Sequence, residues 1–148
     1  MIAISILLPL HLVFVGLWIG CVSTEALFER ALLGKGPAVE LLLARLHRRV
    51  DLAVEIPAIF IVLVTGGLMV GQAQDSSALR AVAGFGLLAM AANAYCVWLV
   101  FQRRDKAAAG DWVGFARLDR QQHKIGALVL GAILAALAAG LVHGADVS

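Results

Sequence analysis

Four long stretches of the chain contain no Asp, Glu, Lys or Arg. Each has about the 20 residues with which an α-helix crosses the roughly 30 Å hydrocarbon core of a bilayer. A transmembrane β-strand would require apolar and polar residues to alternate, and these stretches do not alternate. The pattern therefore predicts four membrane helices centred on the uncharged stretches 1–24, 56–74, 81–102 and 125–145.

The polar segments between these stretches predict how the helices are connected. An amphipathic pattern over 39–50 leads into the second stretch, so this helix is expected to begin before its uncharged part. Short connections join antiparallel neighbours, and the prediction is therefore an all-α fold, a four-helix up-down transmembrane bundle. We expect one integral membrane domain over 1–148, with helices at about 3–30, 45–73, 78–104 and 116–143.

The composition excludes several other classes of protein. With 61% hydrophobic and 15% charged residues, the chain is more apolar than soluble domains, where these shares are about one half and one quarter. Two cysteines are too few for a disulfide-stapled secreted fold. A net charge of +2 is too small to indicate a nucleic-acid partner, so the lipid bilayer is the expected partner.

The basic residues predict the orientation of the bundle. Of the 12 Lys and Arg residues, all except Arg80 flank or occupy the first and third connections. The positive-inside rule then puts these connections in the cytoplasm and both chain termini outside, in a bacterial-type inner membrane. Glycines such as Gly67 and Gly71 permit close helix packing, and they also leave a homo-oligomer or a larger membrane complex open.

Acidic and histidine residues lie at similar depth near the predicted cytoplasmic boundary of three helices. His47, Asp51 and Glu55 follow one another at intervals of four, which stacks them on one helix face. The first and fourth helices carry further pairs at the same interval, Glu25 with Glu29 and Asp119 with His123. Metal sites in helical bundles are built from such inward-facing carboxylates and imidazoles.

This pattern predicts one metal site with an inner and an outer layer. Its ligands suit iron, manganese or zinc. Cys21 and Cys96 lie at similar depth and are either soft ligands for copper or packing residues, so copper stays open as well. We expect four residues to converge on the ion and three to act as outer ligands or supports. The first set is Glu25, Asp51, Glu55 and His123, and the second is Glu29, His47 and Asp119.

A second interpretation assigns the same acids to ion pairs at the membrane boundary. Five arginines are near enough in sequence to neutralise them: Arg45, Arg48, Arg49, Arg117 and Arg120. Glu55 favours the metal site, because it lies about one turn inside the boundary, where an unpaired carboxylate is costly. Pro57 would lie inside the second helix and free the carbonyl of Ala53, which predicts a kink beside Glu55.

His11 lies deeper in the first helix and has no charged neighbour in the sequence. Its face continues through Trp18 to Glu25, because intervals of seven return to nearly the same angle. Two interpretations of this histidine stay open. It either forms a hydrogen bond between helices or ligates a haem.

The segment 11–20 has the form H-x6-W-x-G. It resembles the first helix of the HemJ-type protoporphyrinogen oxidases and of the related CopD-like copper-resistance membrane proteins. Segments 46–49 and 56–58, followed by Gly66 or Gly67, are similar to the start of their second helix. Arg80 stands where the HemJ-type proteins carry a lysine. The resemblance implies a four-helix membrane protein that binds haem b through His11.

These observations leave three functions open. The first is an integral membrane metalloprotein with a carboxylate and histidine metal site at the cytoplasmic face, in a redox or metal-handling role. The second, implied by the resemblance, is a haem b-binding membrane oxidoreductase with His11 as axial ligand. The third is an accessory subunit of a larger membrane complex, which suits a chain with short loops and glycine-rich helix faces.

Overall fold

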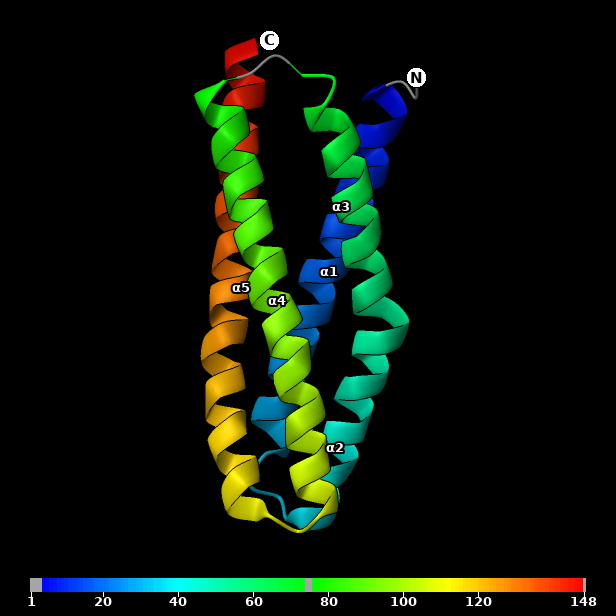
Figure 1. The fold of residues 1–148 in the computed structure, drawn as a ribbon, viewed down its shortest axis with the longest axis vertical. Coiled ribbons are helices and arrows are strands. Elements are labelled where there is room, and N and C mark those ends of the chain that lie inside the picture. Colours follow the sequence, from blue (N-terminus) through cyan, green and yellow to red (C-terminus); the bar gives the residue numbers. More distant parts are fainter. Residues whose placement is uncertain (1–3, 74–75, 148) are drawn as a thin grey trace.

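The computed structural model describes residues 4–73 and 76–147, and the elements within them are all helical. Along the chain these are α1 (Ile4–Leu32), α2 (Pro37–Val50), the π-helical turn η1 (Asp51–Glu55), α3 (Ile56–Val70), α4 (Ser77–Ala108) and α5 (Trp112–Val147). α2, η1 and α3 follow one another without a break and form one rod beside α1, α4 and α5 (Figure 1). The described chain is an all-α bundle of four rods that run up and down in turn, which confirms the predicted fold.

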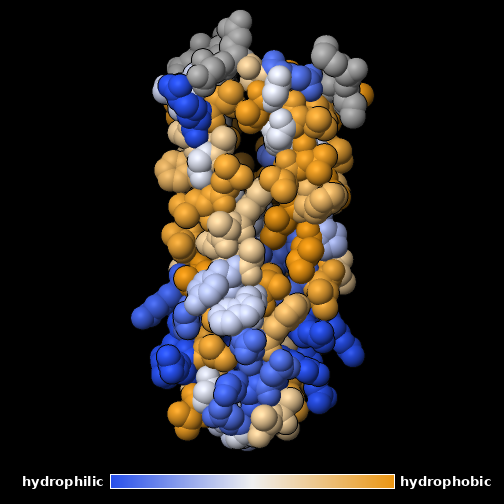
Figure 2. All heavy atoms as spheres, in the orientation of Figure 1, coloured by the Kyte–Doolittle hydropathy of each residue, from blue (hydrophilic) through white to orange (hydrophobic). Residues whose placement is uncertain are grey.

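The two ends of the bundle differ in chemistry. The connections 33–36 and 109–111 lie at one end, which we call the basic end, and α1 starts and α5 finishes at the other (Figure 1). Figure 2 shows hydrophilic residues gathered toward the basic end and hydrophobic residues over most of the remaining length. Within the bundle, α4 packs along α5, α1 packs along α3, and α2 lies against α4.

All four rods are long and apolar enough to cross a membrane, over Ile4–Leu32, Pro37–Val70, Ser77–Ala108 and Trp112–Val142. Large apolar side chains face outward along them, for example those of Val13, Phe60 and Leu134. So much exposed apolar surface is stable only against surroundings as apolar as lipid. The chain is therefore an integral membrane protein in contact with the bilayer.

The interior of the bundle combines an apolar core with polar contacts between rods. All four rods contribute side chains to the core around Trp18. The indole Nε1 of Trp18 donates a hydrogen bond to Oδ1 of Asn93 at 3.2 Å. Seven residues earlier on α1, His11 Nδ1 lies 2.8 Å from Thr65 Oγ1. The face of α1 that runs through His11 and Trp18 to Glu25 thus points into the bundle.

Two rods begin earlier than the sequence predicts, and both extensions are at the basic end. The second rod starts at Pro37 rather than near residue 45, because proline suits the first turn of a helix and Gly36, with φ of 111°, permits the sharp turn before it. The fourth rod starts at Trp112 rather than near residue 116. Its first turn is capped by Asp111, whose Oδ1 accepts a hydrogen bond from the Gly114 amide at 2.9 Å.

The π-helical turn η1 lies where the sequence predicts a kink beside Glu55. Pro57 has no N–H group and its ring crowds the carbonyl of Ala53, and a wider turn relieves this crowding. Residues four apart are separated by slightly more than one turn in an α-helix and by slightly less than one turn in a π-helix. The π-helical turn η1 therefore cancels part of the rotation that would otherwise move Glu55 away from the face of His47. Asp51 and Glu55 both face the interior, with 1% and 3% of their surfaces exposed.

Candidate metal centre

The predicted ligands lie together inside the bundle, toward its basic end. They come from three rods: Glu25 and Glu29 from α1, His47, Asp51 and Glu55 from α2 and η1, and Asp119 and His123 from α5. Six of them form two groups of three whose ligand atoms lie within 4.8 Å of one another. We call Glu25, His47 and Asp51 the Glu25 group, and we call Glu29, Asp119 and His123 the Glu29 group.

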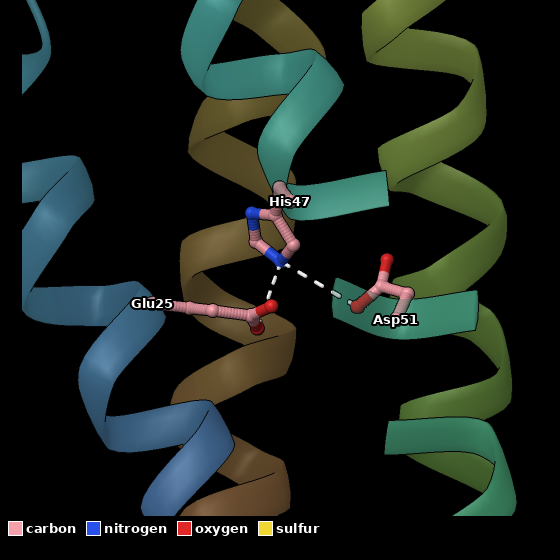
Figure 3. Close-up of side chains that lie close together, drawn as sticks. All are labelled: Glu25, His47 and Asp51. Carbon is pink, nitrogen blue, oxygen red and sulfur yellow. Dashed lines mark ion pairs between the residues drawn. The ribbon is translucent and has the colours of Figure 1, made fainter. Parts of the chain in front are cut away.

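In the Glu25 group, two carboxylates face the same imidazole nitrogen (Figure 3). His47 Nε2 lies 3.0 Å from Glu25 Oε2 and 3.8 Å from Asp51 Oδ1. The other oxygens of the two carboxylates, Glu25 Oε1 and Asp51 Oδ2, are buried without a hydrogen-bond partner among the residues that the structure describes. Because buried polar atoms are nearly always satisfied in folded proteins, these two oxygens are positions where an ion or an ordered water can bind.

The Glu25 group lines a cavity of about 200 Å³ within the bundle. Glu55 and His123 line the same cavity, so both residues face it from the two different rods that carry them. Asn93 and Gln122 add amide groups to the lining, and Gln122 Oε1 is a third buried oxygen without a described partner. An ion or water in this cavity would therefore meet several oxygen ligands.

In the Glu29 group, the protein supplies its own cation. Nη1 of Arg103 lies 2.6 Å from Glu29 Oε1 and 2.6 Å from Asp119 Oδ1, and the arginine is completely buried. The guanidinium also lies over the ring of Phe115, 5.6 Å from its centroid. His123 Nε2 is 3.3 Å from Glu29 Oε2. One guanidinium already contacts both carboxylates of this group, so it is the weaker candidate for a metal.

His47 joins the two groups, because its two ring nitrogens face different carboxylates. Nδ1 lies 3.1 Å from Glu29 Oε1, while Nε2 faces the Glu25 group. The sequence predicts His47 as an outer ligand and His123 as an inner one, whereas His47 is the buried residue and 36% of the His123 side chain is exposed. The reason is that α2 starts at Pro37 and packs against α4, which takes His47 into the bundle.

Two residues of the site escape sequence reasoning, Arg103 and Gln122. In the sequence, Arg103 is one of the basic residues near the predicted boundary, and it serves there only to predict the orientation of the bundle. The signal that would have found it is spacing, because Leu99, Arg103 and Ala107 share one buried face of α4 at intervals of four. Gln122 carries no charge and gave no signal, yet its Nε2 donates a hydrogen bond to Glu29 Oε1 at 3.1 Å.

The arginines that the ion-pair interpretation relies on lie elsewhere. Among the described residues, Arg45, Arg48, Arg49, Arg117 and Arg120 make no ion pair with an acid of either group. Arg48 instead lies over the ring of Phe101, 5.1 Å from its centroid. An arginine therefore accounts for the Glu29 group, through Arg103, whereas the ion-pair partner of Glu25 and Asp51 is the imidazole of His47.

No protein-family model, curated protein or solved structure matches this chain. The resemblance of segment 11–20 to the HemJ-type and CopD-like proteins stays a prediction. What the chain does must therefore be argued from the geometry and charge of its own residues.

Proposed function

We propose that this protein is an integral membrane metalloprotein that holds one divalent metal ion at the Glu25 group, in a redox or metal-handling role. The observation that carries the proposal is the pair of buried, unpartnered carboxylate oxygens, Glu25 Oε1 and Asp51 Oδ2, beside His47 Nε2. Three ligand atoms of this kind within 4.8 Å of one another match what first-row metals bind.

The charge balance of the buried site supports a bound cation. Five carboxyl groups belong to it, and among the described residues one guanidinium contacts them, on Glu29 and Asp119. The other described groups beside them that can carry a positive charge are the two imidazoles of His47 and His123. Glu55 is close enough for its charge to act on both Glu25 and Asp51. A metal ion among these three carboxylates would replace their mutual repulsion with attraction.

The residues of the site suggest a division of roles. Glu25, His47 and Asp51 would bind the ion, with Glu55 as a fourth ligand from the same cavity. Metal-bound imidazoles usually donate their second N–H to a carboxylate, which fixes the ring and its tautomer. Glu29 is available for this role, because its Oε1 lies 3.1 Å from His47 Nδ1. Iron, zinc, manganese and copper all accept such a ligand set.

We infer the orientation from the basic end. All Lys and Arg residues except Arg80 flank or occupy the connections at that end, and the positive-inside rule assigns such connections to the cytoplasm. The metal site would then face the cytoplasm of a bacterial-type inner membrane, with both termini outside. A reporter that is active only in the cytoplasm, fused to the C-terminus, should stay inactive, and an active reporter would overturn this orientation.

Metal binding is tested with the full chain purified in detergent, stripped with a chelator and titrated with Zn²⁺, Mn²⁺ or Fe²⁺. Calorimetry and elemental analysis should find one ion per chain for at least one of these metals. Asp51→Asn should abolish this binding, because it removes a ligand charge while keeping the size of the side chain. Asp105→Asn is the matched control, since Asp105 is exposed and pairs with Arg104. The proposal fails if the stripped protein binds none of the metals, or if Asp51→Asn binds them as well as the parent.

A second candidate function is a haem b-binding oxidoreductase with His11 as axial ligand. The observation in its favour is the hydrogen bonding of the ring. The Thr65 hydroxyl is 2.7 Å from the carbonyl of Ile61, and when it donates there, His11 Nδ1 donates to Thr65 Oγ1. That tautomer leaves the lone pair of Nε2 available for iron. A visible spectrum decides between the candidates. A Soret band that disappears in His11→Ala would favour haem, and a colourless protein would make His11 a link between helices.

A further inference from the structure

A groove on the outside of the bundle is separate from the metal centre in both position and chemistry. It runs between α4 and the start of α5 and has a volume of about 630 Å³. Its lining includes Tyr95 and Trp98 from α4 and Arg117 from α5. At 1.5 Å per residue, Trp98 lies about 15 Å along α4 from the helix end at Ala108. The groove therefore extends from the basic end toward the apolar middle of the bundle.

The deeper part of the groove presents an aromatic wall. The rings of Tyr95 and Trp98 are stacked, with centroids 5.6 Å apart and planes inclined by 17°. Gln121 Nε2 donates a hydrogen bond to the Tyr95 hydroxyl at 2.5 Å, which ties α4 to α5 across the groove. Half of the Trp98 surface is exposed. Tyr and Trp in this position are typical of the zone where lipid headgroups meet acyl chains.

The end of the groove nearest the connection 109–111 is basic. Lys106 Nζ is paired with Asp111 Oδ2 at 2.8 Å, and the guanidinium of Arg117 has no ion-pair partner among the described residues. Two cations and one carboxylate give this end a formal charge of +1, which complements a single phosphodiester. Charged side chains thus lie beside the aromatic wall of the groove and between it and the connection 109–111, as a phospholipid headgroup adjoins its acyl chains.

We propose that this groove binds the headgroup of an anionic glycerophospholipid, with the phosphate at Arg117 and Lys106 and the upper acyl chain along Tyr95 and Trp98. A zwitterionic lipid would bring its own cation toward these two basic side chains, so the groove discriminates by charge. The proposal is independent of the metal site, because it shares none of the residues of the Glu25 group.

The test uses tryptophan fluorescence of the full chain in phosphatidylcholine nanodiscs, quenched by lipids with brominated acyl chains. Brominated phosphatidylglycerol should quench more strongly than brominated phosphatidylcholine, because it is retained beside Trp98. Trp18 is buried and adds an unquenched background. The partly buried Trp112 is replaced by Phe in every sample, so that the quenching reports on Trp98. Arg117→Gln should lower the preference for the anionic lipid by about fivefold, the effect expected for one basic residue near a membrane surface.

The matched control is Arg120→Gln, which removes the same charge from the same helix outside the groove. It should leave the preference unchanged. The proposal is overturned if both variants lose the preference equally, since that indicates a diffuse surface potential, or if neither loses it. It is also overturned if soluble glycerol phosphate displaces the lipid, which would make the ligand a free anion. A dimer in native mass spectrometry that Trp98→Ala dissociates would assign the groove to a second copy of the chain.

Discussion

The Glu25 group and the Glu29 group contain the same three residue types, one glutamate, one aspartate and one histidine, and they share the interior of one bundle. They differ in what neutralises them. In the Glu29 group, Arg103 contacts both carboxylates at 2.6 Å. Among the described residues, no lysine or arginine makes an ion pair with the Glu25 group, and it retains two buried carboxylate oxygens without partners.

This difference shows that ligand type and spacing are not enough to identify a metal site. A metal ion that entered the Glu29 group would have to displace a guanidinium held by two charge-assisted contacts. An ion that entered the Glu25 group would displace no guanidinium, and it would replace the contacts of His47 Nε2 with the two carboxylates. The better candidate is therefore the group whose carboxylates contact no arginine or lysine among the described residues. The predictions below test this contrast, beginning with the largest expected effect.

Replacing Arg103 should have the largest effect on stability. Arg103→Gln leaves Glu29 and Asp119 buried without their cation, and breaking a buried pair in this way costs about 3–5 kcal/mol. We expect a much lower unfolding temperature in detergent, measured on the metal-free protein. Arg103→Lys should recover part of the loss, because it restores the charge without the second donor. An Arg103→Gln variant that unfolds with the parent would contradict the assigned role of this guanidinium.

Replacing Asp51 should change the stability of the protein in opposite directions with and without metal. In the chelated protein, Asp51→Asn removes a buried negative charge. Desolvation and the neighbouring Glu25 and Glu55 disfavour this charge by more than His47 favours it, so stability should stay constant or rise. With metal at 100 times its dissociation constant, the parent gains about 2.7 kcal/mol, which the variant forgoes. Unfolding temperatures of the parent and the variant, measured with and without added metal, test whether the order of their stabilities changes. A variant that is less stable under both conditions by the same amount would indicate a structural role alone.

Replacing Glu29 should weaken the metal site although Glu29 does not face the ion. Glu29→Gln loses the carboxylate that faces His47 Nδ1, and loss of such a partner typically lowers metal affinity by about 10–100-fold. Asp119→Asn is the matched control, because it loses a contact with Arg103 but no contact with His47. Calorimetric titration of both variants should separate them. Equal affinities would show that Glu29 does not position the imidazole.

The sequence predicts the fold well because its signal is long and redundant. Each rod contains a stretch without charges that is about as long as a bilayer is thick, and an error of several residues at an end does not change the bundle. The ends themselves depend on single residues. Gly36 and Asp111 set them through a positive φ and a helix cap, and neither feature stands out in a pattern of apolar residues.

The candidate site is less predictable, because it depends on which side chains neutralise one another across helices. Spacing brings Asp51 and Glu55 to one face, but it does not reveal that Pro57 widens the turn that carries them. Nor does it indicate that Arg103, rather than one of the five arginines nearer in sequence, reaches the acids. The sequence also predicts His123 as the inner ligand and His47 as the outer one, whereas His47 is the more buried of the two. The reason is again tertiary, because the packing of α2 against α4 buries His47.

The smallest effect on stability is expected at Lys106 and Asp111, an exposed ion pair of similar geometry. This pair serves as the reference against which the buried pair of Arg103 and Asp119 is compared. The side chains of Lys106 and Asp111 are 2.8 Å apart, close to the 2.6 Å between Arg103 and Asp119. Hydrogen bonds from Lys106 and from the Gly114 amide lower the pKa of Asp111 below its ordinary value. A carboxyl whose pKa is lowered by folding contributes stability above its unfolded pKa, and the contribution is lost as the pH falls through the folded pKa.

Asp111→Asn keeps a side chain that can cap α5 and removes only the charge. The unfolding midpoint of this variant should therefore lie slightly below that of the parent at neutral pH, and the two should converge in acid. Water and salt screen an exposed pair, so the difference at neutral pH should be far smaller than for Arg103→Gln. A series of melts from neutral to acidic pH measures both points. If the exposed pair mattered as much as the buried one, short distance alone would explain the Glu29 group, and the contrast with the Glu25 group would lose its physical basis.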